Sequence, residues 1–196
     1  MRQVPTIYFI RHGETDWNAE RRYQGQRDIP LNDRGRAQAR RNGEALKPLL
    51  PAIAGLRFIS SPLSRTRETM HIVRETLGLE IAHYDVDDRI IELHYGDWQG
   101  RLQSDLPQLD PEGWEAREAD PFHWRPKGGE NYVDLSERLR SWAGSLEGAC
   151  VVVSHGGVSR ALRGMLVDGI VATDVPRLEV PQDRILVLSN RSLHWV

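Results

Sequence analysis

Short apolar runs alternate with longer amphipathic stretches along most of the chain. Apolar runs bounded by polar or turn residues are typical of buried strands. They predict strands at 6–10, 56–59, 81–86, 149–153 and 185–188, with a possible edge strand at 193–196. Strands that alternate with helices favour an α/β fold, a three-layer sandwich with a mostly parallel central sheet and helices on both faces.

Four stretches with apolar residues at helical spacing predict the helices of this sandwich. The first has Asp33 as its N-cap and is closed by Pro48 and Pro51. The second begins at 60–62, with Pro62 near its first position, and ends at Gly78. The other two helices are predicted at 133–146 and 157–167.

Two stretches lack clear periodicity. Residues 11–33 form a polar, glycine-containing loop after the first strand. Residues 88–131 are rich in Pro, Gly, Trp and acidic residues, and they predict loops and short helices that form a lid or side wall. Because no internal repeat, low-complexity tract or linker interrupts the chain, we expect one domain over residues 1–196.

Composition narrows the possible partners. Hydrophobic residues make up 39% and charged residues 28%, an ordinary globular balance, and the formal net charge of -2 gives no basic field for nucleic acid. No apolar run approaches a membrane span or a signal-peptide core, so we expect a cytoplasmic protein without a membrane partner. The single cysteine, Cys150, precedes an apolar run and is expected to pack in a strand.

Reactive side chains follow three of the predicted strands. Arg11 and His12 follow the first, Arg65 lies beyond the second, and His155 follows the strand at 149–153. Ligands of open α/β sheets bind beyond the carboxyl ends of the strands, so these side chains should meet in one pocket. Arginine binds phosphate oxygens bidentately, and a helix that starts near Gly157 would point amide groups toward an anion. The pattern predicts a phosphate pocket without a metal, although a lone histidine at such a position is more often structural.

The segment Arg11-His12-Gly13-Glu14-Thr15-Asp16-Trp17-Asn18 resembles the signature of the histidine phosphatase superfamily, also called phosphoglycerate mutase-like. Similarity continues along nearly the whole chain. Further matching segments are Gln24-Gly25 with Asp28 and Pro30-Leu31, Ser61-Pro62-Leu63-Ser64-Arg65-Thr66 with Thr69, Glu92 with Gly96, Trp98 and Gly100, Gly128-Gly129-Glu130, and Ser154-His155-Gly156-Gly157. The resemblance implies a phosphoglycerate mutase-like fold and an enzyme that acts on phosphomonoesters without a cofactor.

The resemblance also implies roles for individual residues. A neutral His12 would attack phosphorus and form a phosphohistidine. Glu92 would protonate the leaving oxygen and then take a proton from water. The implied catalytic set is His12, Glu92, Arg11, Arg65 and His155, and the implied phosphate- and substrate-binding set is Arg11, Asn18, Gln24, Gly25, Arg65, His155 and Gly156. No metal ligand is implied.

Three functional classes remain open. The superfamily includes hydrolases and phosphoglycerate mutases, and the mutases place a lysine where this chain has Gln103. The stretch 96–100 is closer to the phosphatase form, whereas 92–96 resembles the mutases. We therefore expect a phosphatase, with a cofactor-dependent mutase as the alternative. A catalytically weak binding module is a third possibility, which the presence of both histidines and both arginines disfavours.

Substrate choice is expected to depend on the middle of the chain, where aromatic residues gather. These residues either line a pocket for an apolar or ring-bearing leaving group or, as the preferred interpretation, pack the lid. They are Trp98, Trp114, Phe122, Trp124 and Tyr132. The sequence predicts a small phosphomonoester as the partner without identifying it, and leaves the oligomeric state open.

Overall fold

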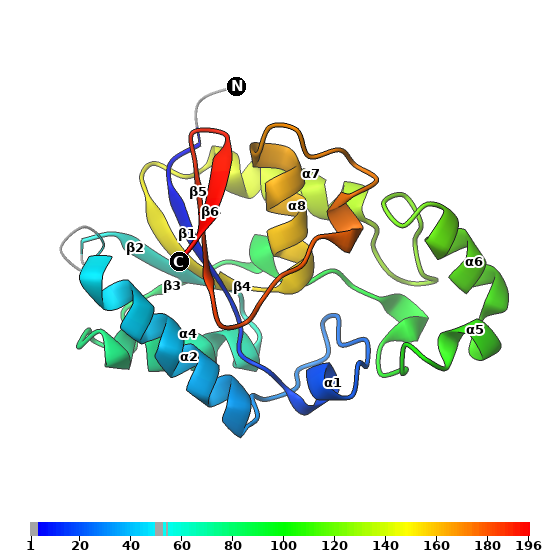
Figure 1. The fold of residues 1–196 in the computed structure, drawn as a ribbon, viewed down its shortest axis with the longest axis horizontal. Helices are drawn as coiled ribbons and strands as arrows, with labels where there is room; N and C mark the ends of the chain where they lie inside the picture. Colours follow the sequence, from blue (N-terminus) through cyan, green and yellow to red (C-terminus); the bar gives the residue numbers. More distant parts are fainter. Residues whose placement is uncertain (1–3, 50–52, 54) are drawn as a thin grey trace.

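The computed structural model describes residues 4–49, 53 and 55–196, and six strands in them form one mixed sheet (Figure 1). The strands are β1 (Ile7–Arg11), β2 (Arg57–Ser60), β3 (Asp85–Val86), β4 (Cys150–Ser154), β5 (Ile185–Ser189) and β6 (Ser192–Trp195), in the spatial order β3-β2-β4-β1-β5-β6. The first four of this order are parallel, and β5 and β6 add an antiparallel hairpin. The predicted α/β fold around a mostly parallel sheet is confirmed.

Alternate residues of the central strands enter two different cores, because successive strand side chains point to opposite faces. Phe9 and Val152 pack with Leu162 on one face. Ile10 and Val153 pack with other apolar side chains on the opposite face. The whole of β4 is buried, as expected for a strand that is covered on both sides. Cys150 is part of this strand, as predicted.

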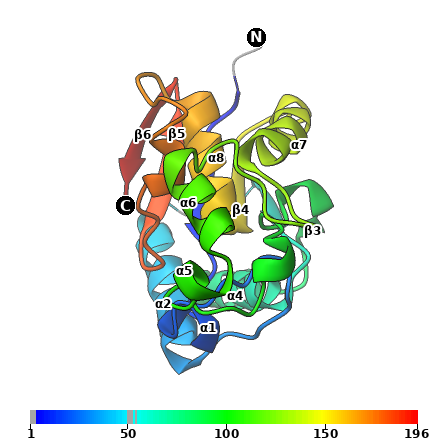
Figure 2. The same cartoon turned by 90° about the vertical axis from the view of Figure 1, so that its right-hand side faces the viewer.

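Helices cover both faces of the sheet (Figures 1 and 2). The helices α2 (Asp33–Leu46) and α4 (Ser64–Thr76) pack together on one face. The helices α7 (Tyr132–Gly144) and α8 (Gly156–Leu166) pack together on the other. These four helices correspond to the four predicted stretches and complete the three layers.

Several predicted boundaries were wrong by a few residues. The N-cap of α2 is Asn32 rather than Asp33, and its side chain accepts a hydrogen bond from the Gly35 amide at 2.9 Å. Helix α4 begins at Ser64, so Pro62 lies outside it. The reason is a long-range cap, since the distant Asp28 carboxylate accepts a 2.8 Å hydrogen bond from the Ser64 amide. A local pattern cannot reveal that contact.

Other segments are shorter or more ordered than predicted. The strand expected at 81–86 is reduced to β3, because residues 81–84 form turns at the exposed edge of the sheet. The predicted loop at 11–33 contains a short helix, α1 (Asp16–Ala19), with a Thr15 and Asn18 capping box. Helix α2 is followed by η1 (Lys47–Leu49), which contains Pro48, while Pro51 lies outside the described residues.

The middle of the chain consists of loops and short helices, as predicted. Its elements are η2 (Asp88–Ile90), η3 (Gly96–Trp98), α5 (Leu106–Leu109) and α6 (Pro111–Ala119), and η4 (Val175–Arg177) follows α8. Helices α5 and α6 stand at one end of the molecule (Figure 1). Trp98 is buried there, with its ring centroid 4.2 Å from Trp124 and 6.2 Å from Trp114. The packing interpretation is therefore right for this tryptophan cluster.

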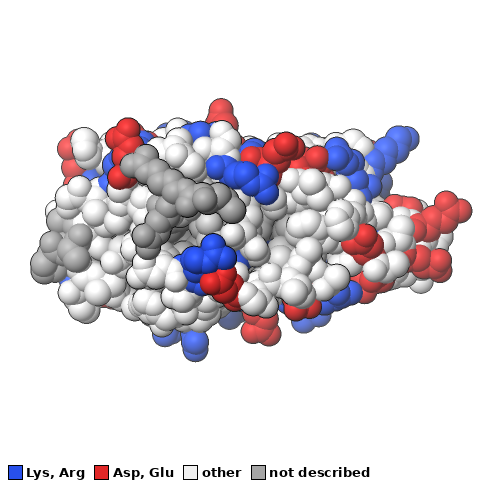
Figure 3. All heavy atoms as spheres, turned by 90° about the horizontal axis from the view of Figure 1, so that it is seen from above, with Lys and Arg blue, Asp and Glu red and all other residues white. Residues whose placement is uncertain are grey.

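The surface gives no sign of a dominant charge on the face shown in Figure 3. Lys and Arg side chains are interspersed with Asp and Glu over that face, and acidic side chains gather at the end that α6 forms. Within the described part of the chain, no helix combines the length and apolar character needed to cross a membrane. Because neither sign of charge dominates this face, we expect the attraction of an anion to depend on individual arginines.

Candidate active site

The predicted site residues from three separate segments meet at the carboxyl ends of β1 and β4. Arg11 and Ser154 are opposite each other as the last residues of the two strands. The next residue in each segment is a histidine, and the ring centroids of His12 and His155 are 5.3 Å apart. Arg65 approaches from the first turn of α4. The parallel sheet thus brings together the side chains that the sequence analysis expected in one pocket.

His12 is held in one tautomer by the backbone. Its side chain is buried, and Nδ1 lies 2.7 Å from the Gly13 carbonyl oxygen, which can only accept a hydrogen bond. Nδ1 therefore carries the proton, and the unprotonated Nε2 accepts a 3.3 Å hydrogen bond from Arg65 Nε. Burial, followed by the nearby Arg65 and Arg11 cations, holds the pKa of His12 well below its usual range, against the opposing hydrogen bond to Gly13. The ring is neutral at physiological pH.

Arg65 is almost fully buried and is oriented by main-chain oxygens. Its Nη2 donates to the Gly25 carbonyl at 2.7 Å, and its Nη1 donates to the Arg27 carbonyl at 2.8 Å. Its Nε lies 3.3 Å from His12 Nε2. Burial lowers the pKa of Arg65 to about 10, which still leaves it cationic at neutral pH. Gly25 adopts a φ of 54°, which favours glycine, and so directs its carbonyl to the guanidinium.

Arg11 lies beside a second arginine. Its Nη1 donates to the Val180 carbonyl at 2.6 Å, and its Nε is buried without a hydrogen-bond partner among the described residues. Burial, then the neighbouring Arg160, lowers the pKa of Arg11 to about 10. A buried N–H group without a partner is costly, so this donor fits a site that an anionic ligand completes.

His155 is the N-cap residue of α8 and is fully buried. Its Nε2 lies 2.6 Å from Ser61 Oγ, and its Nδ1 has no partner in the described part of the structure. When Ser61 donates to Nε2, Nδ1 carries the proton and becomes a free donor. Burial, followed by Arg65 and His12, holds the pKa of His155 well below its usual range. Both histidines are therefore uncharged beside two arginines.

The Glu92 carboxylate is fixed at the start of α8. It accepts hydrogen bonds from the Leu93 amide at 2.9 Å and from the Gly157 amide at 3.1 Å. A β-carbon at Gly157 would overlap with Glu92 Oε1, so glycine permits this close approach. The Gly157 amide does point toward an anionic group, as the sequence predicted, but that group is the Glu92 carboxylate. The neighbouring Gly156 lies beside Arg11 and Arg160.

Asn18 and Gln24 have different surroundings. Asn18 Oδ1 accepts hydrogen bonds from the Thr15 amide and from Gln182 Nε2, at 3.2 and 3.1 Å, so its oxygen caps α1. Gln24 is buried, and its Oε1 has no hydrogen-bond partner among the described residues. Of the two, Gln24 has the polar group that a ligand could satisfy.

The sequence analysis missed a segment at 178–182 that holds the site together. Its carbonyls accept from Arg160 at Leu178, from Arg163 at Glu179 and from Arg11 at Val180, at 2.8, 2.7 and 2.6 Å. Gln182 Nε2 also donates to the His12 carbonyl at 3.1 Å. Carbonyl contacts of this kind carry no residue signature, so no sequence signal could have identified this segment.

Arg160 was also missed, although the sequence holds a signal for it. It lies four residues after Gly156 in α8, a spacing that places two residues on one helix face. A β-carbon at Gly156 would lie 3.5 Å from Arg160 Nη1 and 3.6 Å from Arg11 Nε. The two guanidinium groups therefore face the same side of Gly156, and the arginine cluster has three members.

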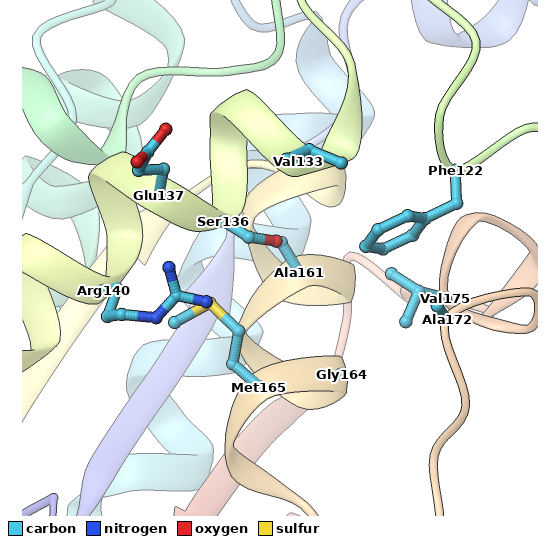
Figure 4. A pocket seen from close by; sticks show the side chains of 10 residues that line it. All are labelled: Phe122, Val133, Ser136, Glu137, Arg140, Ala161, Gly164, Met165, Ala172 and Val175. Carbon is cyan, nitrogen blue, oxygen red and sulfur yellow. The ribbon is translucent and has the colours of Figure 1, made fainter. Parts of the chain in front are cut away.

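Two cavities differ sharply in character. One of about 230 Å³ is lined largely by polar side chains, including Tyr95, Tyr132 and Arg160. Another of about 340 Å³ lies between α7, α8 and η4, where Phe122, Met165 and Val175 give it an apolar wall (Figure 4). None of the predicted site residues lines either cavity, and Arg160 is the member of the arginine cluster that lines the first. No group of three or more His, Cys, Asp and Glu side chains in the described residues could hold a metal ion.

Comparison with known proteins defines the family. The family model of the histidine phosphatase superfamily (branch 1) matches residues 7–196, and the chain belongs to that superfamily. It is 36% identical to a glucosyl-3-phosphoglycerate phosphatase of Mycobacterium tuberculosis over 176 residues, which cover 82% of this chain and 74% of that protein. It is 32% identical over 188 residues to a probable phosphoglycerate mutase GpmB of Salmonella paratyphi C, covering 95% and 82% of the two chains.

A solved structure agrees with this assignment. The structure of a mycobacterial glucosyl-3-phosphoglycerate phosphatase in complex with VO3 matches with a TM-score of 0.78 and 32% identity, covering 98% of this chain and 96% of that one. The predicted phosphoglycerate mutase-like fold and the predicted superfamily are both confirmed. The chain is an enzyme of the histidine phosphatase kind, a phosphoric monoester hydrolase.

Proposed function

We propose that this chain hydrolyses phosphomonoesters through a phosphohistidine on His12 Nε2. The observation that supports it most directly is the state of His12, a buried neutral ring whose Nδ1 proton is bound to a carbonyl oxygen. That arrangement leaves Nε2 unprotonated, as a nucleophile must be. Arg65 Nε donates a 3.3 Å hydrogen bond to Nε2, and we propose that this donor turns to a phosphoryl oxygen when the substrate binds.

In the first step, Nε2 attacks phosphorus while the bond from phosphorus to the ester oxygen breaks. Arg11, Arg65 and His155 surround Nε2 and would bind the three non-bridging oxygens, whose charge spreads in the transition state. Gly156 allows the phosphoryl group to approach the backbone. Gln24 and Asn18 complete the polar wall with their amide groups, and Gly25 contributes through the carbonyl that orients Arg65.

Glu92 is the proposed proton donor and acceptor. In its protonated form it gives a proton to the leaving alcohol oxygen, and the resulting carboxylate then takes a proton from the incoming water. That water attacks phosphorus and the P–N bond breaks. Inorganic phosphate is released, and neutral His12 is restored. The amides of Leu93 and Gly157 hold the carboxylate in place for both steps.

We also propose that no metal takes part. The cations that a dianionic phosphoryl group needs are supplied by Arg11, Arg65 and Arg160, which lie around one pocket. Chelators should leave kcat/KM unchanged, and a strong loss with EDTA that a divalent metal restores would contradict this part. A single domain over 1–196 and a cytoplasmic location remain predictions of the same proposal, the second supported by the reduced, buried Cys150.

The substrate is proposed to be a small phosphomonoester. The relatives named above include a phosphatase and a probable mutase, and the mutase reaction is the second candidate. The presence of Gln103 beside the polar cavity, where mutases place a lysine, supports hydrolysis over transfer. A binding module without turnover is disfavoured because both histidines and all three arginines are in place.

The deciding experiment incubates the purified protein with a panel of phosphomonoesters and with 2- and 3-phosphoglycerate. Inorganic phosphate and the isomer ratio are followed together. Phosphate release without isomer exchange is the expected result. Isomer exchange with little release would move the chain to the mutase class, and silence in both measurements would favour the binding module.

A further inference from the structure

Ser61 lies at the edge of the candidate active site and is not one of the predicted site residues. It is the first residue after β2, and the pairing of Ser60 with Val153 brings it next to the residues that follow β4. Its amide donates to the Val153 carbonyl at 3.0 Å, and its own carbonyl accepts from Thr66 Oγ1 at 2.8 Å. Because Ser61 is fully buried, its hydroxyl needs a partner inside the protein.

The partner of that hydroxyl is His155. Ser61 Oγ lies 2.6 Å from His155 Nε2 and makes no other hydrogen bond among the described residues. Neither side chain is exposed to solvent. Two arrangements fit this contact, because either the hydroxyl or the ring nitrogen can be the donor.

The two arrangements differ in how many polar groups they leave without a partner. If His155 Nε2 donated to Ser61, the serine hydrogen would have no acceptor, and the lone pair on His155 Nδ1 would have no donor. If Ser61 donates to Nε2, the Nδ1 N–H alone is left without a partner in the described part of the chain. Buried polar groups without partners are costly, so the second arrangement is favoured.

The start of α8 supports the same tautomer. His155 is the N-cap residue of α8, a position where a side-chain acceptor commonly binds a backbone amide of the first turn. The His155 side chain makes no such bond. A protonated Nδ1 could not accept one, and it remains available as a donor.

His12 and His155 therefore share a tautomer but offer different atoms to a ligand. The Gly13 carbonyl fixes the proton on His12 Nδ1 and leaves Nε2 unprotonated for attack. The Ser61 hydroxyl occupies His155 Nε2 and leaves an N–H at Nδ1. Two imidazole rings with centroids 5.3 Å apart thus supply one nucleophile and one hydrogen-bond donor, and neither ring needs a positive charge.

We propose that Ser61 is a positioning residue, which fixes His155 as a neutral donor that binds a phosphoryl oxygen through Nδ1–H. Ser61 does not touch the substrate, and its effect passes entirely through His155. The inference rests on the proposed hydrolysis at His12, but the tautomer of His155 can be measured without turnover.

The first test is nitrogen-15 NMR of the ligand-free protein with labelled histidine, because protonated and unprotonated ring nitrogens give separate signals. His155 should carry its proton on Nδ1 and none on Nε2 near pH 7, and comparison with His155→Asn assigns its signals. The preference for Nδ1–H should be lost in Ser61→Ala. A wild-type His155 with its proton on Nε2, or with both nitrogens protonated, would overturn the inference.

The second test is a double-mutant cycle on kcat/KM for p-nitrophenyl phosphate. Ser61→Ala should lower this value by about 10- to 100-fold, the range for a lost hydrogen bond to a charged group. In a chain that already carries His155→Asn, the same change should cost less than about twofold, because a residue that acts only through His155 has nothing left to position. Ser61→Thr keeps the hydroxyl and should retain most of the wild-type value.

Ser60→Ala is the matched control. Ser60 is buried, and its hydroxyl donates to the Ser61 carbonyl at 2.9 Å, so this variant removes a buried hydrogen bond that His155 does not share. It should keep the NMR signals and the rate of the wild type.

Each contrary result has a distinct meaning. An equal loss of rate in Ser60→Ala and Ser61→Ala would overturn the inference and leave hydrolysis at His12 standing. A full loss from Ser61→Ala on top of His155→Asn would overturn it in the same way, because Ser61 would then act through the fold. A wild type that shows the Nδ1–H signal but hydrolyses no phosphomonoester would instead contradict the proposed function.

Discussion

The phosphate end of this site, around His12, and the polar cavity that Arg160 lines, here named the leaving-group end, are built in different ways. At the phosphate end, His12, Arg65 and His155 are each no more than 3% exposed, and backbone carbonyls of the segment after β1 orient the first two. At the leaving-group end, side chains from the middle segments and α8 surround an open volume of about 230 Å³. The first is a buried cluster held by backbone contacts, and the second is a cavity lined by side chains from loops and helices.

Because of this difference, we expect one set of residues to carry out the reaction and another to select the substrate. Strand ends and backbone carbonyls set the position of the nucleophile and the arginines, so the chemistry depends on the sheet. We expect the choice of alcohol to depend on the middle of the chain, where residues such as Tyr95 and Arg117 line the cavity from loops and short helices. Loops tolerate change better than a packed sheet, so substrate preference can vary while the phosphate end is retained.

Removing the nucleophile should break the phosphate end completely. In His12→Ala no phosphohistidine can form, and kcat should fall by at least about 10⁴-fold for every substrate, because the leaving-group end cannot replace the attacking atom. Steady-state phosphate release from p-nitrophenyl phosphate measures it, and a circular dichroism spectrum confirms folding. Residual activity above about a tenth of the wild type would show that another group attacks phosphorus.

Changing Glu92 should expose the boundary between the two ends. Glu92→Gln keeps the shape and removes the proton, so kcat should fall by about 10²- to 10³-fold for alkyl phosphates, whose leaving oxygens need protonation. Aryl phosphates, which leave readily as anions, should lose much less. Initial rates with a matched alkyl and aryl pair decide this, and equal losses on both would contradict the acid role.

The buried histidines of the phosphate end should also make the free energy of unfolding depend on pH. The pKa values of His12 and His155 are held well below 6.5 in the folded chain, chiefly by burial. Below about pH 6.5 the unfolded chain therefore binds more protons, and the free energy of unfolding falls as pH falls, by up to about 1.4 kcal/mol per pH unit for each histidine. Urea unfolding at several pH values measures the slope. His155→Asn should make it shallower, and an unchanged slope would show that His155 titrates normally in the folded state.

The smallest effect is expected far from both ends. Burial raises the pKa of the Cys150 thiol to about 12, so it is neither accessible nor ionised. Thiol-blocking reagents at neutral pH should leave activity unchanged and label the chain only after unfolding. Mass spectrometry of native and urea-treated samples reports this. Rapid labelling of the native chain with loss of turnover would show that the packing of β4 is less tight than described.

The sequence allowed prediction of the phosphate end more fully than of the leaving-group end, for a physical reason. Strands and the residues that follow them are recorded locally, so Arg11, His12 and His155 could be placed at one sheet edge. The cap of α4 by Asp28 and the Glu92 contact to Gly157 join segments far apart in the chain. No local pattern records such contacts, which is why the start of α4 was predicted wrongly and why Glu92 was not foreseen as the partner of the Gly157 amide.

The leaving-group end escaped prediction because its character depends on packing. Trp98 packs against Trp114 and Trp124, and Trp124 also lines the cavity together with three tyrosines and Arg160. Which of several aromatic side chains fills a core and which faces a cavity is decided by three-dimensional fit. The carbonyls at 178–182 that hold two of the three arginines could not be predicted either, since every residue has a carbonyl.

The central claim is that His12 Nε2 accepts the phosphoryl group from the ester and then passes it to water. The most direct measurement mixes the enzyme rapidly with a phosphorus-labelled phosphomonoester, quenches in alkali and maps the labelled peptide. The account predicts an acid-labile, alkali-stable label on His12 at a stoichiometry approaching one per chain, absent from His12→Ala. Turnover without any label on His12, or a label on another residue, would contradict it.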